Sequence, residues 1–295
     1  MARILKTPAS LPLWTYKAFL LVAAAIWGLG TVVIKSTVDA FPPAWIVGVR
    51  FTAAGIILGV IMLPRFRKHI DAEHLRKGSV LGVMVFLAYW SNSTGLTDTT
   101  ASNSSFLTSL YCVIIPFLGW ALHGPRPTRF NLAAAVVCVA GVGCVSFAGA
   151  AGFSLRFGDL VTLLSALFLS FHVVYTAKFA PGCDMTLLTV IQFLVAGLLG
   201  LAAGLVFEPM PNFAALGADT WTSLAYLAVF ASCVALLLQN LAVARVDPAP
   251  ASLFLATESV FGVLFSVLFP RCCSWANYLP RRCLRASLSS SPASW

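Results

Sequence analysis

Long apolar runs separated by short polar connections make up most of the chain. Each run is about 20 residues long, which is the length at which an α-helix crosses the hydrocarbon core of a bilayer. Several connections contain proline or glycine, the residues that most often end helices. The pattern predicts nine transmembrane helices, near residues 18–37, 44–63, 78–96, 99–121, 130–149, 158–179, 186–207, 221–243 and 249–269.

The composition agrees with this pattern. Of the 295 residues, 59% are hydrophobic and 10% are charged, whereas roughly a quarter of the residues in a soluble domain are charged. We therefore expect an all-α integral membrane protein. The net charge of +9 does not indicate nucleic-acid binding, because most basic residues lie in the short connections. The eight cysteines show no CxxC or CxxH spacing, so we expect no metal site and no cofactor.

Basic residues are concentrated in alternate connections, which sets the orientation of the chain. Cytoplasmic connections of membrane proteins carry an excess of lysine and arginine. The N-terminal segment, residues 1–17, is therefore expected in the cytoplasm, in a multi-pass protein of a bacterial-type inner membrane. Arg156 is the one clear basic residue on the opposite side. The residues expected inside include Arg65, Arg67, Lys68, Arg76, Lys77, Arg126, Arg129, Lys178 and Arg245, and those outside include Asp39, Asp98, Glu208 and Asp219.

The two halves of the chain, residues 18–149 and 158–269, can be laid over each other. The first half contains five predicted spans, and an odd number places the second half in the opposite orientation. Inverted repeats of this kind are typical of secondary transporters. A chance match of apolar segments is the alternative, and the coincidence of polar residues argues against it. The residues that coincide are Arg50 with Gln192, Asn92 with Gln239, and Tyr111 with Glu258.

Several short motifs follow one another in a distinctive order: Trp27-Gly28, Val49–Phe51, Thr99–Pro116, Gly124–Thr128 and Ala251–Phe265. In these motifs, over about residues 18–269, the chain resembles the EamA-type transporters of the drug/metabolite transporter superfamily. The resemblance implies ten helices in two inverted five-helix repeats, with both termini in the cytoplasm. It also implies export or import of amino acids, nucleosides or other small metabolites.

The end of the chain departs from that family. Residues 270–295 are rich in arginine, serine and cysteine and contain no run that could span a membrane. They stand where the resemblance implies a tenth helix. We therefore expect about nine transmembrane helices, with the second repeat reduced to four, and a non-spanning basic tail. A reading-frame change or truncation near Phe269 is our hypothesis for this difference.

Polar side chains inside a span are costly and mark candidate functional residues. Glu258 is the carboxylate deepest within an apolar run, and it would exchange protons or bind a cation, or else lock two helices together. Arg50 would bind a substrate carboxylate or pair with Glu258, or else extend to the membrane surface. His172, with Tyr175 one turn further on, would relay protons or make a structural helix contact.

Neutral polar and aromatic residues complete the candidate pathway. The face of the fourth span from Ser102 to Ser109 is expected to line a cavity shared with the ninth span. Amide and hydroxyl groups suit a zwitterionic or polar metabolite, although hydrogen bonding between helices is the structural alternative. These further candidates are Trp27, Tyr89, Asn92, Ser102, Asn103, Ser109, Tyr111, Gln192, Gln239 and Asn240.

Together these features predict a secondary transporter that moves a small polar metabolite, amino acid-like or drug-like, by alternating access, and the expected direction is export. No phosphate-binding glycine loop is present in the sequence, which disfavours ATP-driven transport by this chain. The expected partners are the lipid bilayer, the substrate, a coupled proton or ion, and a second copy in a homodimer. The alternatives are a membrane-embedded enzyme acting on a lipid or prenyl substrate, and an inactive truncated transporter.

Overall fold

The computed structural model describes residues 11–38, 40–64, 69–122, 126–133, 136–137, 140 and 156–268. The predictions for the first ten residues, for most of the fifth span and for the tail at 270–295 lie outside the described residues. The same is true of Asp39, Arg65, Arg67 and Lys68.

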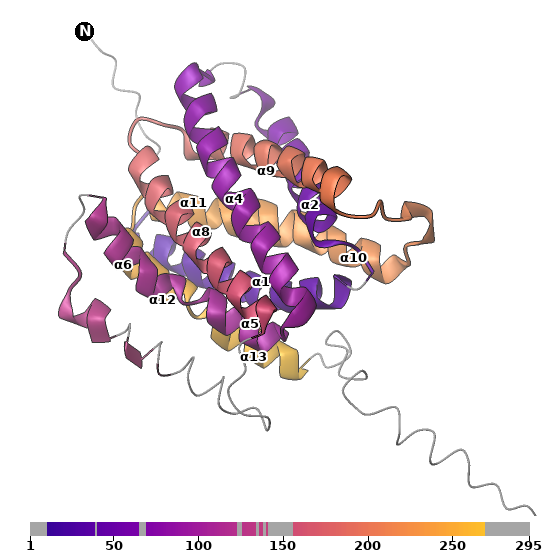
Figure 1. The fold of residues 1–295 in the computed structure, drawn as a ribbon. Helices are drawn as coiled ribbons and strands as arrows, with labels where there is room; N and C mark the ends of the chain where they lie inside the picture. The colour runs from indigo at the N-terminus through magenta and orange to yellow at the C-terminus, as the bar shows by residue number, and fades with distance from the viewer. Residues whose placement is uncertain are drawn as a thin grey trace, which may run out of the picture.

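The described chain is helical and forms a bundle (Figure 1), and a large cluster of buried hydrophobic side chains lies inside it. Seven helical segments of the described part are long and apolar enough to cross a membrane. A further long helix, α4, carries charged residues at its start and serine, asparagine and threonine near its end, which lowers its hydropathy. The elements are α1 (Leu13–Thr37), α2 (Pro43–Ile61), α4 (Ala72–Asp98), α5 (Ala101–Thr108), α6 (Tyr111–Ala121), α8 (Phe157–Phe179), α9 (Met185–Phe207), η1 (Phe213–Ala215), α10 (Ala218–Tyr226), η2 (Leu227–Val234), α11 (Ala235–Val243), α12 (Pro248–Leu255) and α13 (Glu258–Leu268).

Local sequence explains where several helices begin. Pro43 is the first residue of α2, a position where its missing N–H costs nothing and its fixed φ favours the helix. The carboxylate of Asp71 accepts the N–H of His74 and caps α4. Asp184 accepts the N–H of Thr186 in the same way and caps α9. Side-chain oxygens at these positions satisfy N–H groups that the helix itself leaves free.

Contacts between helix ends show which ends share a face of the bundle. Both carboxylate oxygens of Glu208, which follows α9, lie 2.9 Å from the backbone N of Ala44 at the start of α2. Asp98, at the end of α4, accepts the N–H of Gly158 at the start of α8. We call this side, with the ends of α4 and α9 and the starts of α2 and α8, the Glu208 face.

The opposite side is held by His74. Its Nε2 accepts the N–H of Asp184 at 3.1 Å, and its Nδ1 lies 2.8 Å from the carboxylate of Asp71. Because Nε2 accepts a hydrogen bond, the ring proton of the neutral imidazole lies on Nδ1 and is donated to Asp71. The starts of α4 and α9 therefore meet on one side, which we call the His74 face.

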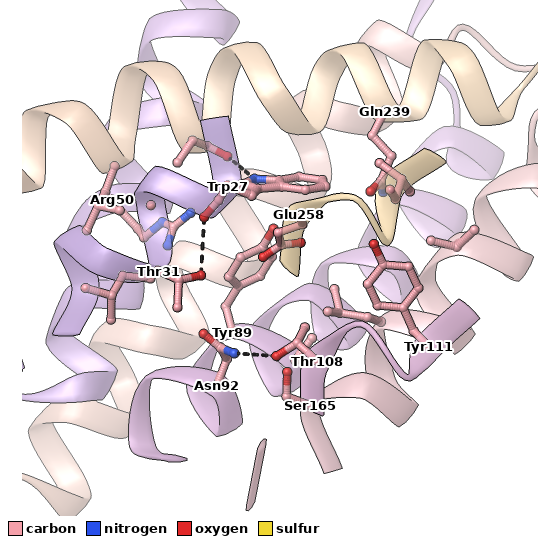
Figure 2. Close-up of a pocket in the computed structure, with 18 residues that line it drawn as sticks. Trp27, Thr31, Arg50, Tyr89, Asn92, Thr108, Tyr111, Ser165, Gln239 and Glu258 are labelled. Atoms are coloured by element: carbon pink, nitrogen blue, oxygen red, sulfur yellow. Dashed lines mark hydrogen bonds between the residues drawn. The ribbon is translucent and has the colours of Figure 1, made fainter. Parts of the chain in front are cut away.

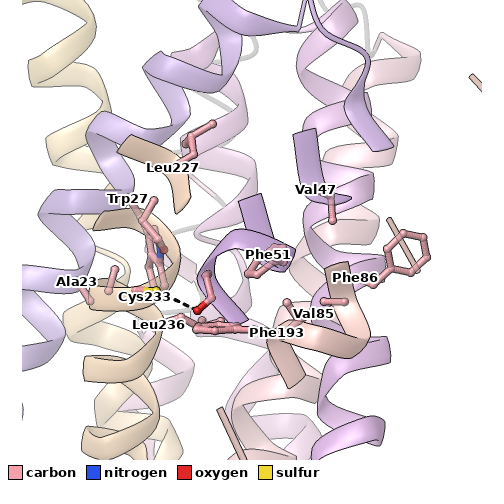
Figure 3. Packing of buried hydrophobic residues seen from close by; sticks show 14 of the residues in the cluster. Ala23, Trp27, Val47, Phe51, Val85, Phe86, Phe193, Leu227, Cys233 and Leu236 are labelled. Carbon is pink, nitrogen blue, oxygen red and sulfur yellow. Dashed lines mark hydrogen bonds between the residues drawn. The ribbon is translucent and has the colours of Figure 1, made fainter. Parts of the chain in front are cut away.

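Glycines allow the central helices to pack closely. The interface between α2 and α9 is the most extensive in the described part of the chain. A Cβ at Gly48 would lie 2.7 Å from the backbone N of Leu201, and one at Gly200 would lie 2.7 Å from the Cα of Gly48. Helix association inside membranes depends on such close approach of backbones. Phe51 of α2 and Phe193 of α9 also pack against each other, with 5.6 Å between their ring centroids (Figure 3).

Two predicted spans are interrupted, which corrects the expectation of single helices over 99–121 and 249–269. The first divides into α5 and α6, and the second into α12 and α13. The start of α12, the end of α12 and the start of α13 each lie 147 residues after their counterparts in α5 and α6, as from Ala101 to Pro248 and from Tyr111 to Glu258. The two halves of the chain thus break equivalent helices at equivalent positions.

Hydroxyl groups near both breaks bond to backbone carbonyl groups. Ser109 donates to the carbonyl of Ser105, and Thr257 donates to the carbonyl of Phe254. Such bonds offer the backbone an alternative to the regular helical ladder. The half-helices α5 and α13 pack together toward the Glu208 face, and α6 and α12 pack together toward the His74 face.

Candidate functional site

A pocket lies between the halves of the bundle, and both halves contribute to its wall (Figure 2). The space open to the centres of water-sized molecules is about 40 Å³, enough for roughly three waters. A larger solute therefore requires the helices around the pocket to move apart. The residues that line it are Trp27, Gly30, Thr31, Ile34, Arg50, Ala88, Tyr89, Asn92, Thr108, Tyr111, Ser165, Leu169, Val173, Leu227, Ala231, Gln239, Leu255 and Glu258.

Arg50 brings a buried positive charge to this pocket. Its side chain projects from α2 and is 1% exposed, and its Nε donates to the hydroxyl of Ser232 at 3.0 Å. The guanidinium carbon lies 4.8 Å from the ring centroids of both Phe51 and Tyr89, a distance at which cations are attracted to aromatic faces. Its buried Nη1 has no hydrogen-bond partner in the described structure, so part of the guanidinium is available to a ligand.

This arrangement corrects the expectation that Arg50 reaches the membrane surface. The helix α2 is packed against α9, η2 and α4, so the side chain points into the bundle, where no path to the interface remains. The alternative of an ion pair with Glu258 is not seen either, since no ion pair joins the two among the residues described.

Glu258 brings a buried carboxyl group to the same pocket. It is 7% exposed and is the first residue of α13, where the positive end of the helix dipole favours a carboxylate. Tyr111 occupies the equivalent place as the first residue of α6 and is 3% exposed. The helix breaks therefore present one acidic and one phenolic group to the cavity at matching positions of the two halves.

Neutral groups around the two charges fall into two sets. Some are already paired, because Trp27 donates to the carbonyl of Ala231 at 2.8 Å and Asn92 donates to Thr108 at 3.0 Å (Figure 2). The others are buried atoms without a partner in the described structure. These atoms are the hydroxyls of Tyr111 and Ser165 and the Nε2 of Gln239.

Buried polar atoms are normally hydrogen-bonded, and leaving one unpaired costs roughly 1–3 kcal/mol. Unpaired groups at one cavity therefore indicate a place where water or a polar ligand binds. With a guanidinium and a carboxyl group on its wall, the pocket has groups that suit a carboxylate and an ammonium group on one molecule.

Seven predicted site residues line this pocket: Trp27, Arg50, Tyr89, Asn92, Tyr111, Gln239 and Glu258. The remaining predicted residues within the described part of the structure lie elsewhere, and most have structural partners. These are Asn103, Ser109, His172, Tyr175, Gln192 and Asn240. Ser102 belongs to α5, and its side chain is outside the described part of the structure.

His172, Gln192 and Asn240 make buried contacts between helices of the second half, away from the pocket. Nε2 of His172 lies 3.1 Å from Oε1 of Gln192 and 3.4 Å from the hydroxyl of Thr176. Asn240 donates to the hydroxyl of Thr189 at 2.9 Å. These contacts join α8, α9 and α11 within the bundle. They correspond to the structural alternative for His172 rather than to a place on the pocket wall.

The serine face of the fourth span does not line the pocket as expected. Ser109 is buried and donates to the carbonyl of Ser105 within its own segment. Because the helix breaks after Thr108, continuous helical spacing no longer relates α5 to α6. Thr108 and Tyr111, on either side of the break, line the pocket instead. Tyr175 also lies away from it and packs between Phe171 and Phe179.

Three polar residues of the pocket were missed in the sequence: Thr31, Thr108 and Ser165. Thr31 stands one helical turn after Trp27 and donates to its carbonyl, so helical spacing from Trp27 could have identified it. Thr108 gave no separate signal beside the neighbouring serines. Ser165 is one of many serines in apolar runs, and only packing places it at the cavity.

With this geometry in view, comparison with known proteins is informative. A model of the EamA-like transporter family matches residues 14–147 and 156–271. The chain belongs to the EamA-like transporter family. The family's domain is thus present in two halves, in an all-helical multi-pass membrane protein, and the protein is a membrane transporter.

Several relatives are themselves named only as transporters. An uncharacterized transporter of Archaeoglobus fulgidus is 29% identical over 84% of this chain and 76% of its own length. The uncharacterized transporter YvbV of Bacillus subtilis is 26% identical over 72% and 69%. The uncharacterized inner membrane transporter YedA of Escherichia coli is 23% identical over 81% and 78%.

One solved crystal structure shares the fold. It has a TM-score of 0.69 and 20% sequence identity, and it covers 86% of this chain and 88% of its own. At this identity the similarity shows the fold alone.

Proposed function

We propose that this protein is a secondary transporter that carries a small polar metabolite out of the cell by alternating access. One observation carries the proposal. The guanidinium of Arg50 and the carboxyl group of Glu258 line one buried pocket between the two halves without pairing with each other in the described structure. Buried charges are costly unless they are neutralised. A zwitterionic metabolite would neutralise both at once.

The interrupted helices support the same proposal. In transporters built from inverted repeats, substrate sites typically lie near the midplane at discontinuous helices. Here the breaks of α5–α6 and α12–α13 place Tyr111 and Glu258 at the pocket. The paired half-helices α5 and α13 would close the route to the Glu208 face, and α6 and α12 would close the route to the His74 face.

The driving force that we propose is a proton gradient, an ion exchange or the substrate gradient itself. Glu258 is the group that would exchange a proton, because a carboxylate inside a membrane span can be held in either protonation state. We place the protein in the cell membrane, with the N-terminus and the His74 face in the cytoplasm. Fusion of a cytoplasmic-side reporter to the N-terminus would test this orientation.

Reconstitution in liposomes tests transport directly. The full chain would be inserted, and uptake of labelled amino acids and other small polar metabolites would be measured with and without a pH gradient. We expect accumulation of at least one zwitterionic metabolite. Loading the substrate on one side or the other of right-side-out vesicles would give the direction, and preferential efflux is the result expected for export.

Two variants test the roles of the charges, and each has a matched control outside the pocket. Arg50→Gln should reduce transport roughly ten- to hundredfold, because a charged hydrogen bond to the substrate is lost. Arg245→Gln removes an exposed arginine and should leave transport unchanged. Glu258→Gln should remove the dependence on a pH gradient, whereas the exposed Glu73→Gln should not. Equal transport by Arg50→Gln and Arg245→Gln would contradict the proposal.

A further inference from the structure

The charged groups of the pocket follow a definite order. The guanidinium of Arg50 lies over the ring of Tyr89, with 4.8 Å between its central carbon and the ring centroid. Tyr89, Tyr111 and Glu258 line the same pocket as Arg50. Figure 2 shows the same order, with Arg50 on one side, Tyr89 and Glu258 in the centre and Tyr111 on the other side. An aromatic residue therefore stands between the two charges.

Arg50 and Glu258 reach the pocket from different halves of the chain. Arg50 lies on α2, seven positions after that helix begins at the Glu208 face. Glu258 is the first residue of α13, beyond the break that ends α12.

Much of the pocket wall is apolar. It includes Trp27, Leu227 and Ala231, and the indole N–H of Trp27 is already bonded to a carbonyl. At the far end, the hydroxyl of Tyr111 is buried without a partner in the described structure, and it can accept a hydrogen bond from an ammonium group.

Resting on the transport role proposed above, we propose that the pocket selects an elongated zwitterion over an α-amino acid. Such a molecule has its carboxylate and its ammonium at opposite ends of a flexible apolar chain. The carboxylate would bind the free side of Arg50, the methylene chain would pass Trp27 and Tyr89, and the ammonium would bind Glu258 and Tyr111.

The spacing of charges in the ligand decides between the two classes. In an α-amino acid a single carbon separates the carboxylate from the ammonium, so both protein charges would have to converge on adjacent atoms. Hydrogen bonds between heavy atoms are only about 2.7–3.2 Å long. With Tyr89 between Arg50 and Glu258, an α-amino acid can satisfy one charge and leaves the other unneutralised. An ω-amino acid can satisfy both.

Two isomers provide a matched pair of probes. Tritium-labelled 6-aminohexanoate and norleucine have the same composition and differ only in the carbon that bears the ammonium group. Uptake of each would be measured in liposomes containing the full chain. We expect 6-aminohexanoate to be favoured roughly ten- to hundredfold, the factor set by one charged hydrogen bond. The shorter 4-aminobutanoate should be transported less well than 6-aminohexanoate, a comparison that needs no variant.

Variants then assign the preference to the named residues. Glu258→Gln should bring the ratio of the two isomers close to one, and Tyr111→Phe should lower it by a smaller factor. Glu73→Gln, outside the pocket, should leave the ratio unchanged. Thermal stabilisation of the purified wild-type protein by each isomer gives a second measurement, and 6-aminohexanoate should stabilise it more.

The outcomes separate this inference from the proposed function. Equal or faster uptake of norleucine would overturn the elongated-substrate inference and leave zwitterion transport standing. If neither isomer is transported or stabilises the protein, the inference is also overturned. The wider panel of polar metabolites then decides the proposed function by itself, because transport of any other member would still support it.

Discussion

Replacing Gly48 with alanine should destabilise the bundle, whereas the same change at Gly59 should not. Both glycines belong to α2, so the gain in helix propensity is the same at each, about 0.5–1 kcal/mol. The surroundings differ. A Cβ at Gly48 would lie 2.7 Å from the backbone N of Leu201 and 3.0 Å from the backbone C of Gly200. A Cβ at Gly59 would meet only a side-chain methyl of Val190, at 3.5 Å.

The size of the effect follows from these contacts. Backbone atoms cannot turn aside as a side chain can, so Gly48→Ala forces α2 and α9 apart. Overpacking of this kind costs about 1–3 kcal/mol. Because helix propensity cancels between the two variants, their difference in unfolding free energy should equal that cost. Gly59→Ala should be as stable as the wild type or up to about 1 kcal/mol more stable.

Thermal unfolding of the purified variants in one detergent would measure this difference. For domains of 150–250 residues, each kcal/mol shifts the midpoint by roughly 2–4 °C, so the two variants should differ by several degrees. Equal midpoints for Gly48→Ala and Gly59→Ala would refute the claim that backbone contact at Gly48 holds α2 against α9.

Two further predictions concern the helix ends. Glu208→Gln should destabilise the protein by about 0.5–2 kcal/mol, because the Glu208 carboxylate accepts the N–H of Ala44 at the positive end of α2. The control is Asp219→Asn, which changes an exposed carboxylate. Equal unfolding midpoints for the two variants would contradict the prediction. Hydrogen bonds donated by the backbone and ring of His74 lower the pKa of the Asp71 carboxyl group. The ionised carboxylate therefore stabilises the folded protein at pH values above the ordinary pKa of an aspartate, and this stabilisation is lost as the pH falls through the lowered pKa of the folded state. Asp71→Asn should therefore be less stable than wild type at pH 7 and should match it in acid, as followed by unfolding at a series of pH values; a difference that is constant with pH would refute the assignment.

The fold class and the candidate polar residues were accessible from the sequence. Apolar runs near bilayer length identified the spans, and Glu258 and Tyr111 stood out because polar groups inside such runs are costly. The order of short motifs from Trp27-Gly28 to Ala251–Phe265 gave the family resemblance, which the match to the EamA-like transporter family confirmed. These features are local, so they need no knowledge of neighbouring helices.

Other features depend on which helices become neighbours. His172 and Arg50 are both ionisable side chains in apolar runs, yet His172 is bonded to Gln192 while Arg50 lines the pocket. Periodicity assigns each residue to a face of its own helix but does not say what that face meets. Because the helix is interrupted after Thr108, the helical spacing expected for the fourth span does not predict which side chains face the cavity. Ser109 is bonded within its own segment, and Tyr111 lines the pocket instead.

The sequence by itself determined that this protein is helical, lies in a membrane, repeats its architecture and carries opposite charges inside it. Only the tertiary structure decided that Arg50 and Glu258 share one pocket and that the guanidinium of Arg50 lies over the ring of Tyr89. The physical reason is the range of the interactions. Hydrophobicity and helical hydrogen bonds act over a few residues along the chain, whereas a binding site is assembled from residues that come together only when helices from both halves pack.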